Sequence, residues 1–338
     1  MKLCKTEEAV GQILCHDITQ IIPGVVKDAV FRKGHIIREE DIPVLLSVGK
    51  EHIYIWENDE KMLHENDAAD ILCSICKGEG MHETEVKEGK IELIADCNGV
   101  LKIEREMLRN VNRLGEMMIA SRYGDFPVKK GDKIAGTRII PLVIEKEKME
   151  RAKEVAGEKP IFQILPYQQK KIGLVITGSE VYKGRIQDSF TPVIREKLAE
   201  YGTGIQMQEL SSDDHKQITE IIQSMVDAGM DMIICTGGMS VDPDDRTPLA
   251  IKNTGAEIVT YGAPVLPGAM FMLGYVKGEI PIVGLPGCVM YAKRTIFDLV
   301  LPRLLAGEKI EKEELDRLGE GGLCLNCTFP NCGFGKGV

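Results

Sequence analysis

The chain has 338 residues, of which 43% are hydrophobic and 28% charged, and this globular composition excludes wholesale disorder. Its 42 Lys and Arg against 52 Asp and Glu give a net charge of −10, which excludes a basic nucleic-acid-binding or membrane-surface protein. A small anionic substrate stays compatible with this charge, since backbone amides and a metal ion can hold phosphate.

Residues 1–85 are expected to form a mixed α/β segment. The stretch 34–46 predicts a strand and then a short helix with Asp41 as its N-cap, 53–56 predicts a strand, and 61–80 predicts a helix. No run approaches the roughly 18 apolar residues of a membrane span, and the first residues lack the apolar core of a signal peptide. The sequence therefore predicts a cytoplasmic protein.

Residues 86–145 are expected to form a small β-rich, barrel-like module. Their short apolar runs are separated by glycines and lie at 90–95, 100–103 and 134–144. The charged stretch 145–159 predicts a helix within a linker that spans 146–169.

Residues 170–306 carry the clearest pattern of the chain. Four apolar strands are predicted, at 171–176, 205–210, 232–235 and 280–284. Amphipathic helices are predicted near 191–200, across 218–226 and from about 288 to 305. Strands without polar alternation, separated by such helices, predict a three-layer α/β/α domain with a mostly parallel sheet.

Each predicted strand of this domain is followed by a loop of small or acidic residues. The loops lie at 177–180, 211–214, 236–248 and 285–287, and Asp188 follows the first of them. The carboxyl ends of parallel strands meet at one edge of a sheet, where ligands bind. Glycine-rich turns let backbone amides approach an oxyanion, and acidic side chains can hold Mg²⁺ beside a phosphate. The loops therefore predict one site for a phosphorylated ligand and a divalent metal.

Each loop also has a purely structural explanation. Asp213 or Asp214 fits the N-cap of the following helix, and Thr247 followed by Pro248 fits another helix start. The pair Gly237 and Gly238 fits a tight turn without a ligand. The shared predicted edge favours the binding site over these alternatives.

Residues 170–306 resemble the molybdopterin-binding domain of molybdenum cofactor biosynthesis proteins. This domain occurs in molybdopterin adenylyltransferases, in molybdopterin molybdotransferases and in the CinA family. The run Thr236-Gly237-Gly238 with Asp245 and Thr247-Pro248 resembles the adenylyltransferase loop, while 177–180 and 213–214 resemble molybdotransferase loops. The Leu-Pro-Gly of 285–287 is common to all of them.

The resemblance implies a protein that binds molybdopterin or its adenylate with Mg²⁺ and transfers molybdate to it. Under this resemblance the acidic catalytic positions are Glu180, Asp213 and Asp245, with Mg²⁺ held by Asp213 and Asp245. The other implied substrate-binding positions are Thr177, Gly178, Ser179, Asp188, Asp214, Thr236, Gly237, Gly238, Ser240, Pro286 and Gly287. It also implies a homo-oligomer, and a molybdoenzyme is an expected partner.

Two features separate the chain from a full molybdotransferase. The Asp-Gly-Tyr-Ala motif of that family is absent from the sequence, and Cys288-Val289 stands where the family has Asn-Pro-Val. A carrier or sensor that binds molybdopterin without catalysis therefore remains an alternative. A CinA-like hydrolase of nucleotide diphosphates is another, since Asp242-Pro243-Asp244-Asp245 resembles the Pro-x-Asp-Asp of that family.

Residues 307–338 form a cysteine-containing tail. Cys324, Cys327 and Cys332 follow a C-x2-C-x4-C spacing and supply three thiols, whereas zinc and iron–sulfur sites usually need four ligands. A metal site and a tail with free thiols both fit this pattern.

Overall fold

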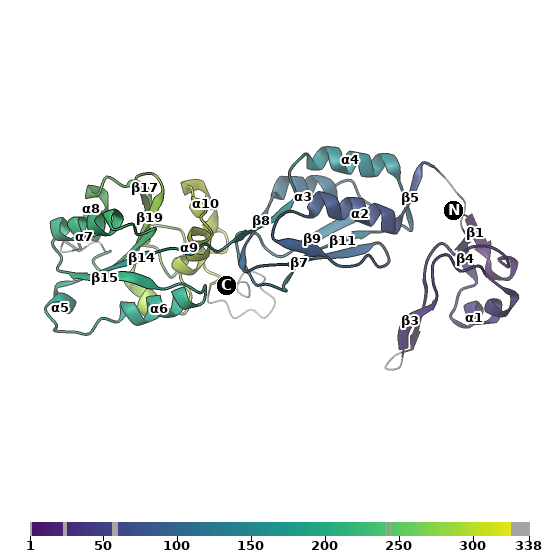
Figure 1. The fold of residues 1–338 in the computed structure, drawn as a ribbon, viewed down its shortest axis with the longest axis horizontal. Helices are drawn as coiled ribbons and strands as arrows, with labels where there is room; N and C mark the ends of the chain where they lie inside the picture. Colours follow the sequence, from purple (N-terminus) through teal and green to yellow (C-terminus); the bar gives the residue numbers. More distant parts are fainter. Residues whose placement is uncertain (1, 23–25, 56–59, 241, 244, 326–338) are drawn as a thin grey trace. The chain divides into compact units, whose positions relative to one another are not determined.

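The computed structural model describes residues 2–22, 26–55, 60–240, 242–243 and 245–325 (Figure 1). The chain forms two compact units. Unit 1 comprises residues 1–96, 103–122 and 131–163, and unit 2 comprises residues 97–102, 123–130 and 164–338. Within the described residues, no helix is both long enough and apolar enough to cross a membrane. The five predicted divisions of the chain stay a prediction.

Unit 1 begins with short elements around a small core. They are β1 (Lys2–Lys5), η1 (Thr6–Glu8), β2 (Ile18–Ile22), β3 (Val26–Phe31), η2 (Glu39–Asp41), α1 (Ile42–Ser47) and β4 (His52–Ile55). The helix predicted within 34–46 is confirmed as α1, and β4 confirms the predicted strand as far as Ile55. The strand predicted before α1 is wrong, because Ile36 makes only an isolated bridge to Ile13. Asp41 is the N-cap residue of α1, as predicted, but its carboxylate makes no capping hydrogen bond there and instead accepts from the Arg38 amide at 2.8 Å in η2.

The rest of unit 1 contains a four-stranded antiparallel sheet in the order β6-β7-β11-β9. The elements are β5 (Met62–His64), α2 (Glu65–Cys76), β6 (Met81–Glu83), β7 (Lys90–Ala95), α3 (Arg105–Asn112), β9 (Met117–Ser121), β11 (Lys133–Ile139), β12 (Val143–Glu145) and α4 (Lys146–Ala156). The helix predicted over 61–80 is shorter, because residues 62–64 pair with β12 and His64 caps α2 by accepting from the Asn66 amide. Three strands that lie mostly in unit 2 form a small sheet in the order β10 (Pro127–Val128), β8 (Gly99–Ile103) and β13 (Phe162–Pro166).

Unit 2 is built on a six-stranded sheet in the order β15-β14-β16-β19-β18-β17. Its strands are β14 (Ile172–Thr177), β15 (Ile205–Ser211), β16 (Met232–Thr236), β17 (Glu257–Tyr261), β18 (Met272–Val276) and β19 (Ile280–Leu285). The helices are α5 (Ser179–Tyr182), α6 (Phe190–Ala199), α7 (His215–Asp227), α8 (Thr247–Asn253), η3 (Gly287–Met290), α9 (Ile296–Leu305), α10 (Lys312–Asp316) and η4 (Arg317–Gly319). The four predicted strands are parallel, whereas β18 and β17 are antiparallel and were not predicted.

Two apolar cores cover the two faces of this sheet. Successive residues of a strand point to opposite faces, so Leu174 joins the core with α6 and α9 while Val175 joins the core with α7 and α8. Both side chains are fully buried, as is Cys235 on the neighbouring strand β16. This arrangement confirms the three-layer α/β/α fold and its mostly parallel sheet.

The long helix predicted from about 288 to 305 is wrong in one respect. The stretch is divided into η3 and α9, and residues 291–295 separate them. Thr295 starts the second helix, because its hydroxyl accepts from the Phe297 amide at 3.2 Å and the Thr295 amide donates to the Asp298 carboxylate at 2.7 Å. This reciprocal capping box begins a separate helix, so the apolar pattern does not form one continuous helix.

Candidate functional site

The parallel register brings four strand ends to one edge of the sheet in unit 2. Thr177 pairs with Ser211, Ile176 pairs with Thr236, and Thr236 pairs with Leu285. The loops that follow these strands therefore start at the same level. We call the space between them the carboxyl-edge cavity.

The carboxyl-edge cavity consists of two adjoining hollows of about 520 and 440 Å³. The larger is lined by Thr177, Gly178, Glu180, Val181, Ile186, Gln187, Asp188, Ser189, Phe190, Asp213, Gly237, Gly238, Asp242, Asp245 and Met290. The smaller is lined by Phe190, Gly237, Gly238, Met239, Ser240, Asp245, Met270, Pro286, Gly287, Cys288, Met290 and Tyr291. Five residues line both, so the two hollows form one continuous groove.

Two glycines set the backbone path at the centre of this groove. Gly237 has φ +84°, and a Cβ there would overlap the carbonyl oxygen of Thr177. Gly238 has φ +55°, and its Cβ would lie 2.9 Å from the hydroxyl of Thr247. Only glycine fits both the conformation and the space. Because neither residue has a side chain, no side chain at these two positions covers the backbone amides of the turn.

A buried pair of hydroxyls fixes the loops to each other. The Thr177 hydroxyl donates to the carbonyl of Thr236 at 3.0 Å and lies 3.0 Å from the Thr247 hydroxyl. Thr247 is the first residue of α8 and is fully buried. Its hydroxyl therefore joins α8 to the end of β14, and the helix N-cap is Arg246 instead.

Backbone amides hold the carboxylates of the groove in place. The Ser179 amide donates to Asp213 at 2.8 Å, and the Ser240 amide donates to Asp245 at 2.7 Å. In each case Oδ2 is the acceptor, and within the described residues Oδ1 has no hydrogen bond to protein. Asp188 accepts from two amides at the start of α6, so its oxygens are more fully used.

The charge of the lining is one-sided. Its acidic side chains among the described residues are Glu180, Asp188, Asp213, Asp242 and Asp245, and these residues include no Lys, Arg or His. An anionic ligand would be repelled by this lining unless a cation came with it. Across the residues that the structure describes, no three His, Cys, Asp or Glu side chains are grouped closely enough to hold a metal by themselves. Mg²⁺ usually takes only one or two carboxylates together with phosphate and water, so this donor set fits a metal brought in with a phosphorylated ligand.

The remaining predicted positions divide into several groups. Ser179 takes part through its amide, which donates to Asp213. Thr236 is fully buried below the groove, and its hydroxyl has no hydrogen-bond partner within the described part of the chain. Asp214 lies outside the lining and caps α7 by accepting from the Lys216 amide at 2.9 Å. Of the two candidate caps at 213 and 214, the second is the cap and the first faces the groove. Cys324 is half-buried away from the groove, and Cys327 and Cys332 lie outside the described residues.

The apolar wall of the groove was not predicted from the sequence. Phe190, Met290 and Tyr291 line it, and Tyr291 is 80% exposed. Cys288 lies beside them, and burial raises the pKa of its thiol, which keeps it protonated. An aromatic and sulfur-rich wall of this kind suits one face of a planar ring.

The site and fold define the class of the domain, an α/β/α module with an acidic, glycine-rich groove at the carboxyl edge. Residues 173–306 match the family model described as "Probable molybdopterin binding domain". Residues 3–57 match a second family model, described as "Domain of unknown function (DUF8806)". The chain thus resembles molybdopterin-binding domains over residues 173–306, and its N-terminal residues 3–57 resemble a family whose description gives no function.

Individual relatives extend this likeness. A molybdopterin molybdenumtransferase of Staphylococcus epidermidis is 24% identical over 296 residues, which cover 83% of this chain and 65% of the relative. A CinA-like protein of Mycobacterium avium is 32% identical over 90 residues, covering 26% of this chain and 21% of that protein. The chain therefore matches less than two thirds of the length of either. The solved structure of the molybdopterin biosynthesis enzyme MoaB from Thermus thermophilus has 24% identity and a TM-score of 0.35, covering 41% of this chain and 98% of that one.

Proposed function

We propose that the carboxyl-edge cavity binds molybdopterin or its adenylate together with Mg²⁺, and that the chain transfers molybdate to the bound pterin. The observation that carries the proposal is the coincidence of glycine turns with a lining of five carboxylates and no cation among its described residues. Such a lining suits a phosphate only when a divalent metal neutralises both partners. The match to the molybdopterin-binding family over residues 173–306 supports the choice of ligand.

Within this proposal the residues of the groove have separate tasks. Asp213 and Asp245 hold the metal through the oxygens that their amide partners leave unused. When bound, Mg²⁺ neutralises phosphate charge and polarises the phosphate oxygens. The amides of Gly237 and Gly238 approach the phosphate, while Phe190 and Met290 pack against the pterin ring. Catalysis then rests on positioning and charge neutralisation rather than on a covalent nucleophile.

Calorimetric titration of the full chain with molybdopterin and with its adenylate, each with Mg²⁺, tests the proposal. We expect Asp245→Ala to bind at least about tenfold more weakly, because it loses a charged metal ligand. Asp214→Asn is the matched control, since Asn is also a good N-cap and position 214 lies outside the lining. Equal binding by wild type and Asp245→Ala would refute the site.

Turnover then separates three versions of the proposal. A molybdotransferase releases molybdenum cofactor when molybdate is added to the loaded protein, and an adenylyltransferase consumes ATP. A carrier or sensor binds one equivalent of pterin and forms no product. The absence of Asp-Gly-Tyr-Ala from the sequence favours testing the carrier first.

A nucleotide diphosphate hydrolase is the second candidate, supported by Asp242-Pro243-Asp244-Asp245 and by the likeness to the CinA-like protein. It predicts metal-dependent hydrolysis of a nucleotide diphosphate and no affinity for pterin. The titration above distinguishes it from the first candidate.

We also propose that the chain forms a homo-oligomer and that a molybdoenzyme receives its product. Exposed apolar side chains near the groove, Tyr182, Ile186 and Tyr291, support a surface that another chain covers. Light scattering on the purified chain measures the oligomeric state, and a monomer at all concentrations would contradict the first part. Cofactor transfer from the loaded chain to an apo-molybdoenzyme tests the second part.

A further inference from the structure

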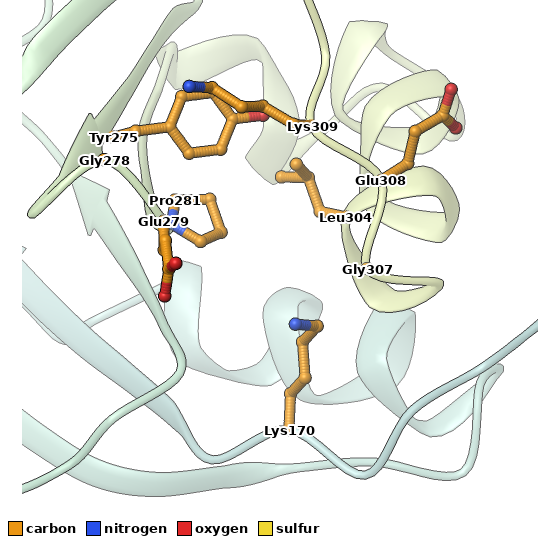
Figure 2. A pocket seen from close by; sticks show the side chains of 9 residues that line it. All are labelled: Lys170, Tyr275, Gly278, Glu279, Pro281, Leu304, Gly307, Glu308 and Lys309. Carbon is orange, nitrogen blue, oxygen red and sulfur yellow. The ribbon is translucent and has the colours of Figure 1, made fainter.

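A second cavity of unit 2, of about 250 Å³, lies at the opposite edge of the same sheet (Figure 2). Its residues come from the segment before β14, from the β18–β19 hairpin and from the end of α9. They are Lys170, Tyr275, Gly278, Glu279, Pro281, Leu304, Gly307, Glu308 and Lys309. We call it the amino-edge cavity, because β14 and β19 begin there.

One of its two carboxylates is already neutralised. Arg303 donates to Glu308 through Nε at 2.9 Å and through a terminal nitrogen at 2.6 Å, and Lys102 also donates to Glu308. Burial acts to raise the pKa of Glu308, but the Arg303 hydrogen bond and charge outweigh it and hold that pKa below its ordinary value. Figure 2 shows the Glu308 carboxylate turned away from Lys170. Glu308 therefore does not cancel the positive charge of the cavity.

Lys170 supplies that positive charge. Its half-buried side chain rises toward the space between Pro281 and Leu304 (Figure 2). Among the described residues, its ammonium group has no hydrogen bond or ion pair. The nearby carbonyls at the end of α9 are used elsewhere, since Gln168 donates to Leu305 through its amide and to Ala306 through its side chain. A half-buried ammonium group without a partner is available to form an ion pair with an anionic ligand.

A second ammonium group borders the same cavity. Lys309 lies over the ring of Tyr275, with its nitrogen 5.4 Å from the ring centre. Burial raises the pKa of Tyr275 to about 12, and its hydroxyl accepts from the Ile310 amide at 2.8 Å. The tyrosine is therefore neutral and adds no negative charge. Exposed Glu279 is the one lining carboxylate, among the described residues, that has no cationic partner.

We infer that the amino-edge cavity binds a small multivalent oxyanion such as phosphate. Lys170 has no ion-pair partner among the described residues, and the 3.9 Å pair of Lys309 with Glu257 is exposed and weak, so both ammonium groups stay open to an anion. Ammonium groups act as point charges that suit a compact oxyanion, whereas planar carboxylates are matched best by arginine. The volume lies below the roughly 300–1,000 Å³ of pockets for larger organic ligands. The site needs no Mg²⁺ and does not depend on the function proposed for the carboxyl edge.

Titration calorimetry of the full chain with inorganic phosphate, in EDTA and at constant ionic strength, tests this inference. Phosphate should bind, and Lys170→Met and Lys309→Met should each weaken binding about tenfold or more. Lys171→Met is the matched control, because it removes an exposed lysine next to position 170 that does not line the cavity. Asp245→Ala should bind phosphate as well as wild type, which separates this site from the carboxyl-edge cavity.

Two further arms identify the ion. Molybdate and phosphate are both tetrahedral oxyanions. The one that binds with the higher affinity is the ligand that the cavity selects. Succinate should bind more weakly than either. No phosphate binding by the wild type, an equal loss in Lys171→Met, or tighter binding of succinate would each overturn the inference.

Discussion

The carboxyl-edge and amino-edge cavities are built on the same six-stranded sheet, yet they offer a ligand opposite charges. At the carboxyl edge, loops that follow parallel strands present glycine turns and five carboxylates. At the amino edge, a hairpin and a helix end present two lysines, and Glu308 is neutralised by Arg303 and Lys102. The comparison teaches that the sign of a site depends on which charges already have partners, not on the net charge of −10.

Replacing Gly237 should have the largest effect on this comparison. Gly237→Ala places a Cβ against the Thr177 carbonyl at φ +84°, so we expect a loss of about 3 kcal/mol in the free energy of unfolding and loss of ligand binding at the carboxyl edge. Urea denaturation and calorimetry measure the two effects. Gly255→Ala is the control, with φ +79° but no described atom within 4 Å of its Cβ, and should cost about 1 kcal/mol. Similar losses in both variants would mean that the close approach to Thr177 is unimportant.

Removing Arg303 should alter the amino edge almost as strongly. Arg303→Met leaves Glu308 with Lys102 alone, and we expect unfolding to become easier by about 3 kcal/mol because a mostly buried ion pair is broken. The freed carboxylate should also weaken phosphate binding at the cavity. Arg317→Met removes an exposed pair with Glu313 and should cost about 0.5 kcal/mol or less. Unchanged phosphate affinity in Arg303→Met would show that Glu308 does not control the sign of this cavity.

A smaller effect is expected from the hydroxyl pair that joins the carboxyl-edge loops. Thr247→Val keeps the shape of the side chain but removes the partner of the Thr177 hydroxyl, at a cost of about 1 kcal/mol. Thr203→Val removes only a 3.4 Å hydrogen bond to the Lys170 carbonyl and should cost less. Urea denaturation compares the two variants, and the reverse order would contradict the role given to Thr247.

The pH dependence of unit 1 should show the mildest effect, away from both cavities. Burial lowers the pKa of His64 from 6.5 despite its 2.7 Å hydrogen bond to the Cys15 carbonyl. Because the unfolded chain then binds more protons than the folded one, stability is complete above about pH 6.5 and falls as the pH drops below it. Hydrogen exchange in α2 at several pH values measures this loss. The loss should shrink in His64→Asn and persist in His52→Asn, where the replaced histidine is exposed.

The sequence predicted the parallel part of unit 2 well because its signals are local. Apolar strands such as Met232–Thr236 and amphipathic helices such as α7 are visible in short windows. The antiparallel strands β17 and β18 were missed, since β18 pairs with β19 and β17 pairs with β18, and this pairing is not encoded in a local pattern of either strand. The break before α9 was missed because an apolar helix pattern hid the capping box at Thr295.

The candidate site was predictable to a similar degree. Glycine and aspartate mark the loops at strand ends, so the residues around Gly237 and Asp213 could be predicted from the sequence. Which of two adjacent aspartates caps a helix depends on backbone geometry, which the sequence does not reveal. Phe190 and Tyr291 belong to the groove only because α6 and the segment after η3 converge there. The amino-edge cavity carries no motif at all, and only the structure brings Lys170 and Lys309 together.

The Mg²⁺ dependence of molybdopterin adenylate binding tests the central claim most directly. Calorimetry compares the wild type with a variant that combines Asp213→Asn and Asp245→Asn, each with Mg²⁺ and with EDTA. If the acidic groove holds its anion through the metal, the wild type binds with Mg²⁺ and loses binding in EDTA, and the affinity of the variant does not respond to Mg²⁺. Equal binding by the wild type with and without Mg²⁺ would contradict the account.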